Sequence, residues 1–202
     1  MMLRHGLLAL FWMVSSLLLN GCLAPASSPT RFFLLTALPM SGKTEVKQGL
    51  VVELEPVEIP QYLKRPEMVT RTGGNRLQLE RLYQWAGDLK EDIGRVLMEN
   101  LSQILVSDRV VNLPNRSDSP PNFRVLVSLN RFEPDETGQV LLDARWSLFD
   151  GKDLLIVTRH SRITAQASDS TDYEALAAAM SKALGVLSQE MGEGIRFAAG
   201  QK

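Results

Sequence analysis

Few residues of this chain have the type and spacing that catalysis needs. His160 is one of two histidines, the other being His5 near the start, and a lone histidine cannot build the usual zinc site. Glu53 and Glu55 are two positions apart, so their carboxylates would share a strand face and could pair as acid and base. A solvated strand face produces the same spacing. No motif places a nucleophile beside a base, so the sequence predicts no enzyme, no metal site and no cofactor; a hydrolase is kept only as a third alternative.

Cys22, the only cysteine, offers a different kind of chemistry. It follows the apolar stretch 6–19, which as a helix would span about 21 Å, less than the roughly 30 Å of a bilayer core. The basic residue Arg4 precedes this stretch and small residues follow it, which is typical of a secretory signal peptide. A membrane-spanning anchor and a buried structural cysteine are the alternatives.

The residues Leu19, Asn20, Gly21 and Cys22 resemble the lipobox of bacterial lipoproteins. The resemblance implies that residues 1–21 are a signal peptide that is removed, and that Cys22 carries lipid on its thiol and on its new amino group. One acyl chain binds a membrane marginally, whereas two or more hold stably. Leu23 stands where an aspartate would favour the inner membrane. We therefore expect a lipid-anchored protein on the periplasmic side of the envelope, at the outer membrane.

The remainder divides into a short linker and one domain. Residues 22–30 contain two prolines and small polar side chains and read as a lipidated tether, so residues 31–202 are predicted to form a single α+β domain. The formal net charge of −1 provides no basic field for nucleic acid, so nucleic-acid binding is excluded.

The first half of the domain predicts strands and a helix. Residues 31–38 and 50–60 are strand candidates, and Pro56 and Pro60 indicate an edge or a bulge in the second. Residues 67–80 read as a hairpin that turns at Gly73-Gly74-Asn75.

Helix signals follow this hairpin, and more strands come after the helix. Asp88 is predicted to cap a helix that runs to residue 105, and its apolar positions recur at helical spacing: Leu89, Ile93, Val96, Leu97, Leu101, Ile104 and Leu105. Residues 110–113 are predicted to form a short strand and residues 123–165 an antiparallel meander, and Thr171 with Glu174 is predicted to cap a last helix.

These elements predict an α+β fold, a mostly antiparallel sheet with two long helices packed on one face. The order of the elements also admits two strand–strand–helix half-repeats, although no sequence repeat accompanies it.

One segment combines side chains that are favoured at binding interfaces. Tyr62, Arg65, Pro66 and Arg71 fall within ten residues, and aromatic and arginine side chains are common binding anchors. They are our candidates for contacts with a partner or between subunits. The alternative is that Tyr62 and Trp85 close the core while the arginines face water.

The same segment closely resembles the PqiC/YmbA family of ABC-type transport auxiliary lipoproteins. The motifs that carry the resemblance are Ile59-Pro60, Tyr62-Leu63, Arg65-Pro66, Val69-Thr70-Arg71 and a tryptophan, Trp85, that opens a helix. The C-terminal stretch from residue 173 also fits the closing helix of that family.

The resemblance implies a function that the residues alone do not. Such lipoproteins accompany MCE-type systems, which move lipids between the two membranes and support envelope integrity. The implied role is to dock the tunnel of a PqiB-like MCE subunit at the outer membrane, as a ring-like homo-oligomer, and through that subunit to meet an inner-membrane component. The alternative is a lipid carrier with its own pocket or ring lumen.

Overall fold

The computed structural model describes residues 28–39, 50–107, 110–112 and 120–201. Cys22 and the predicted signal peptide lie outside the described residues. The elements follow in the order β1 (Arg31–Phe33), β2 (Val52–Leu54), the 3₁₀ helix η1 (Gln61–Leu63), β3 (Glu67–Arg71), β4 (Leu77–Trp85), α2 (Leu89–Leu105), β5 (Val110–Asn112), β6 (Phe123–Pro134), β7 (Gln139–Asp150), β8 (Leu155–Gln166) and α3 (Tyr173–Gly200).

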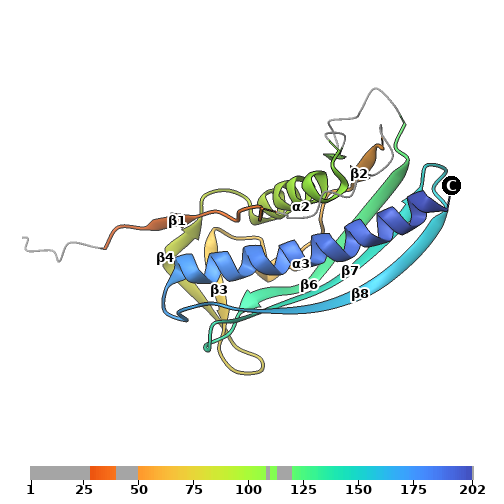
Figure 1. Cartoon of the computed structure of the whole chain (residues 1–202). Coiled ribbons are helices and arrows are strands. Elements are labelled where there is room, and N and C mark those ends of the chain that lie inside the picture. The colour runs from red at the N-terminus through yellow and green to blue at the C-terminus, as the bar shows by residue number, and fades with distance from the viewer. Residues whose placement is uncertain (1–27, 40–49, 108–109, 113–119, 202) are drawn as a thin grey trace, which may run out of the picture.

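The predicted α+β class is confirmed, but the described strands form two sheets instead of one. The larger sheet has the order β5-β2-β6-β7-β8, and the smaller has the order β1-β4-β3. Helix α3 runs along β6, β7 and β8, and α2 packs against α3 (Figure 1). The two sheets meet where Arg71, at the end of β3, forms an isolated bridge with Asp135, the residue after β6.

The predicted meander and hairpin are both present. Strands β6, β7 and β8 pair antiparallel in sequence order, and Trp146 on β7 is completely buried. Its Nε1 donates to Ser161 Oγ on β8 at 3.2 Å, which satisfies the indole inside the core. Strands β3 and β4 form the hairpin, and Gly73 at its turn has a φ of 75°, a region that favours glycine.

The helix caps were predicted correctly for one helix and wrongly for the other. Asp88 caps α2, accepting from the backbone N–H groups of Lys90 and Glu91, and the whole predicted apolar stripe is buried. Helix α3 is capped by Asp172, which accepts from Glu174 N at 3.0 Å. Thr171 instead donates its hydroxyl to Asp169 at 2.8 Å. Both residue types cap helices well, so the pattern alone did not separate two adjacent candidates.

The predicted strand over residues 31–38 is confirmed only at Arg31–Phe33. Beyond β1 the chain passes between the two helices, where side chains take the place of a neighbouring strand. Leu35 N donates to Asp92 on α2 at 2.7 Å, Thr36 N to Ser181 on α3 at 3.0 Å, and Leu38 N to Asn100 on α2 at 3.0 Å. Every buried backbone group needs such a partner, so these polar helix residues admit an extended segment into the core.

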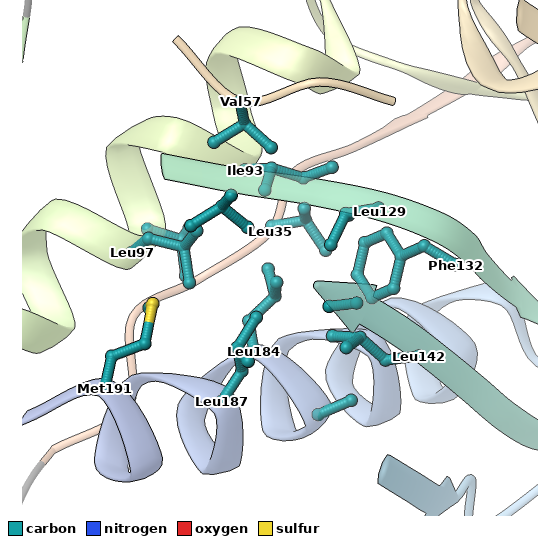
Figure 2. Close-up of a cluster of buried hydrophobic side chains, with 14 of the residues drawn as sticks. Leu35, Val57, Ile93, Leu97, Leu129, Phe132, Leu142, Leu184, Leu187 and Met191 are labelled. Atoms are coloured by element: carbon teal, nitrogen blue, oxygen red, sulfur yellow. The ribbon is translucent and has the colours of Figure 1, made fainter. Parts of the chain in front are cut away.

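Leu35 fills the centre of this arrangement. Its side chain is completely buried, and Figure 2 shows it among Ile93 and Leu97 of α2 and Leu184 of α3. The described apolar residues form one cluster that includes both helices and both sheets. The N-terminal segment is therefore a component of the core and not an appendage.

The predicted edge position of the second strand is wrong. β2 lies inside the larger sheet, parallel to both β5 and β6. Pro56 and Pro60 lie beyond the three residues of β2, so neither proline removes a donor from its ladder. The pairing with β5 joins residues far apart in sequence, which local proline positions cannot reveal.

We expect Leu35→Ala to lower the free energy of unfolding by about 2–4 kcal/mol, because it leaves a cavity between two helices that cannot close around it. Urea unfolding followed by circular dichroism would measure the change. Leu34→Ala is the matched control, since Leu34 is 56% exposed and should change little. Equal effects of the two substitutions would contradict the inserted position of Leu35.

Candidate functional site

The segment from Ile59 to Arg71 has an inward-facing and an outward-facing part. Tyr62, from η1, donates its hydroxyl to Glu133 Oε2 at 2.6 Å. Arg71, at the end of β3, donates Nε to Glu133 Oε1 at 2.7 Å, and Arg131 on β6 pairs with the same oxygen at 2.8 Å. The Glu133 side chain has no exposed surface. One buried carboxylate thus ties the segment to β6.

The protonation of this group follows from its partners. Burial by itself raises the pKa of Glu133, but hydrogen bonds from Tyr62, Arg71 and Arg131 outweigh it, and the net pKa lies below the ordinary value. Burial also raises the pKa of Tyr62, and its bond to Glu133 adds to the increase. Glu133 is therefore an ionised acceptor and Tyr62 a neutral donor at neutral pH, which suits a structural role.

The structure brings together only two of the four predicted contact residues. Tyr62 and Arg71 meet on Glu133, and Trp85 is buried, so Tyr62 and Trp85 do close the core as the alternative held. Arg71, however, does not simply face water, because it is paired. Arg65 and Pro66 lie apart from this pair. A role for any of the four in partner contacts stays a prediction.

Arg65 and Pro66 line a surface hollow of about 290 Å³ at the start of α2. Its lining is completed by Lys64, Gly87, Asp88, Leu89 and Lys90. The Nε of Arg65 is buried and has no hydrogen-bond partner in the described part of the chain. A buried donor without an acceptor is costly, so this hollow is a more promising place for a ligand than the satisfied Glu133 cluster.

Lys90 also lines a second hollow, of about 500 Å³. It is lined by Glu55, Pro56, Glu58, Lys90, Leu126, Val127, Ser128, Arg145 and Ser147. Leu126 and Arg145 are exposed, while their strand neighbours Val127 and Trp146 are buried in the core. Sequence reasoning missed this site, because Arg145 is 55 positions from Lys90 and no local pattern relates the two residues.

The residues first considered for catalysis are bonded to oppositely charged or polar neighbours. The His160 side chain is half-exposed, its Nε2 lies 2.9 Å from Asp143 Oδ1, and Arg162 lies 3.0 Å from the other oxygen. Burial raises the pKa of Asp143, but bonds from Asn130, His160 and Arg162 prevail and hold it at about 2.

Glu53 and Glu55 do not form an acid–base pair, because both carboxylates are paired with the guanidinium group of Arg124. Arg124 lies 3.9 Å from Glu53 and 3.3 Å from Glu55, and it also contacts Asp153 at 2.7 Å. Within the described ranges, no group of three or more histidine, cysteine or acidic side chains is arranged to hold a metal ion. Nor does any helix in those ranges combine the length and apolarity needed to cross a bilayer.

We expect Arg71→Ala to destabilise the fold by about 2–3 kcal/mol, because it removes one of the two cations that compensate a buried carboxylate. Arg81→Ala is the control, since Arg81 is exposed on β4. Thermal unfolding of both variants would test this, and equal midpoints would contradict a structural role for Arg71.

The comparisons with known proteins agree with this architecture. A crystal structure of an uncharacterized protein has a TM-score of 0.70 at 18% identity, covering 83% of this chain and 99% of that one. A DUF330 protein from Xanthomonas campestris has a TM-score of 0.71 at 16% identity, covering 85% and 97%. At such identities the likeness shows the fold alone. No curated protein matches the chain in sequence.

The family assignment comes from the sequence match. Residues 33–192 match the family described as "ABC-type transport auxiliary lipoprotein component", from β1 to the middle of α3. The matched range includes the Ile59–Arg71 segment, the meander and most of both helices. The chain therefore belongs to the ABC-type transport auxiliary lipoproteins, the PqiC/YmbA family.

Proposed function

We propose that this protein is the membrane-anchored docking subunit of an MCE/Pqi-type intermembrane lipid transport system. In this role it holds the tunnel of a PqiB-like subunit at the outer membrane, as a homo-oligomer, and so supports the integrity of the envelope. The observation that carries the proposal is the family match over residues 33–192. Glu53 and Glu55 are both paired with Arg124, which supports a role in binding over one in acid–base catalysis.

The anchor would keep one end of the domain close to the membrane. Cys22 is the proposed lipid attachment site, and residues 23–30 can extend to at most about 28 Å. The chain then enters β1 and passes directly between α2 and α3. A force applied at the anchor would consequently be transmitted to α2 and α3 through the backbone hydrogen bonds of Leu35 and Thr36.

An open sheet edge is available for protein contacts. Strand β8 is the outermost strand of the larger sheet, and the described residues place no strand on its outer side. An extended segment of a partner or of a second copy could pair with it by strand addition. Charged side chains such as Arg159 and Arg162 along β8 would discourage indiscriminate pairing.

The membrane anchor is tested by Cys22→Ser. We expect the variant to leave the membrane fraction after a high-salt wash, because no acyl chain can then be attached to a thiol. Fractionation and immunoblotting against the unaltered protein would measure it. Retention of the variant with the membranes would show that the anchor lies elsewhere.

The docking role is tested by Arg65→Ala. We expect co-purification with the MCE subunit to fall at least fivefold while the unfolding midpoint is unchanged, because the Nε of Arg65 has no hydrogen bond within the described residues that its loss would break. Arg81→Ala, which removes an exposed arginine of β4, should retain co-purification. An undiminished complex with Arg65→Ala would remove Arg65 from the docking surface.

A further inference from the structure

The two hollows at the start of α2 are lined by basic side chains that form no ion pairs among the described residues. Lys90 lines both of them, Lys64 and Arg65 line the smaller, and Arg145 lines the larger. Within the described part of the chain, none of these four side chains has an ion pair. Other arginines, such as Arg124, are paired.

The acidic side chains of the lining offset only part of this charge. Glu55 is paired with Arg124 at 3.3 Å, and Asp88 accepts from the backbone N–H groups of Lys90 and Glu91. Glu58 has no ion pair among the described residues and lowers the positive charge of the larger hollow. Unpaired cations in a concave surface concentrate a positive potential there, which attracts anions.

The buried Nε of Arg65 makes the smaller hollow more specific. This Nε donates to no acceptor among the described residues, although the guanidinium group is shaped to bind two oxygens of a phosphate or carboxylate at once. A phosphate oxygen in the hollow would satisfy this donor. Lys64 and Lys90 would add point charges on either side.

The larger hollow adds an apolar surface to the cationic one. Pro56, Leu126 and Val127 contribute to its lining, and Leu126 is 41% exposed. A volume of about 500 Å³ lies within the range of small-molecule sites. Free phosphate would leave this apolar surface in water, whereas a ligand with a phosphate head and a short apolar portion would cover it.

We propose that the two hollows around Lys90 bind the phosphate head and the adjoining apolar portion of an anionic phospholipid. This goes beyond the docking role, because the domain itself would hold a lipid at a defined place. It does not depend on docking, since the binding can be measured on the isolated protein.

The test is calorimetric titration of the purified full-length protein with dihexanoyl phosphatidylglycerol, at concentrations at which this lipid does not form micelles. We expect saturable binding that weakens at least tenfold in the Lys90→Gln/Arg145→Gln double variant, because it loses two of the four cations. The single variant Lys90→Arg, in which Arg145 is unchanged, should retain most of the affinity. The matched control is Lys182→Gln/Arg159→Gln, two exposed cations outside both hollows, and it should bind normally.

Further arms separate the possible ligands. Inorganic phosphate and uncharged dihexanoylglycerol should each bind at least tenfold more weakly than the lipid. If inorganic phosphate bound as tightly as the lipid, the phospholipid proposal would be wrong and the hollows would be a simple anion site. Binding of an acidic peptide such as hexaglutamate, without binding of the lipid, would overturn it in favour of a protein partner.

Two results would overturn the site itself. One is unchanged lipid affinity in the Lys90→Gln/Arg145→Gln variant, provided that its circular dichroism matches the unaltered protein. The other is the absence of any lipid binding. Either could occur while the complex with the MCE subunit still forms, so failure here is distinguishable from failure of the docking role.

Discussion

The position of the candidate surface depends on the bonds that the buried carboxylate of Glu133 makes with its neighbours. Glu133 sits on β6 with no solvent contact, and its charge is compensated by Arg71 and Arg131 and by the Tyr62 hydroxyl. A charge in this position is tolerated only while its partners are in place, because removing one leaves an uncompensated ion in the core. The hydrogen bonds from Tyr62 and Arg71 to Glu133 therefore hold the segment between β2 and β4 against the larger sheet.

The residues from Tyr62 to Arg71 do not all face the same way. Tyr62 at η1 and Arg71 at the end of β3 both bond to Glu133, and Leu63, Met68 and Val69 between them are buried. Arg65 and Pro66 instead line the hollow at the start of α2, beside Lys90. The same short stretch thus contains a structural half, which is satisfied, and a surface half, which carries a buried donor without an acceptor.

The second organising feature is the passage of residues 34–38 between the helices. Asp92, Asn100 and Ser181 accept hydrogen bonds from the backbone of this segment, so polar side chains lie inside an otherwise apolar interface. Asp92 is also held by Arg95, whose Nη2 donates to Leu35 O at 2.6 Å. The lipid anchor proposed at Cys22 would therefore precede a segment that is itself part of the core.

What the sequence determined by itself was mostly local. The cap at Asp88, the apolar stripe of α2, the turn at Gly73 and the alternation of the meander all depend on residues a few positions apart, and each is present in the structure. The family was also readable, because its motifs are short and contiguous. The choice of Thr171 over Asp172 failed at the scale of one residue, where propensity does not discriminate.

Which polar residues are paired inside the fold, and which stay available at the surface, depends on contacts between distant parts of the chain. Glu133 lies 62 positions from Arg71 and 71 from Tyr62, and Arg145 lies on a different element from Lys90. Likewise, residues 34–38 have the composition of a strand but are bonded to helix side chains. Pairing, burial and the loss of a partner are properties of distances in space, and a single sequence records distance only along the chain.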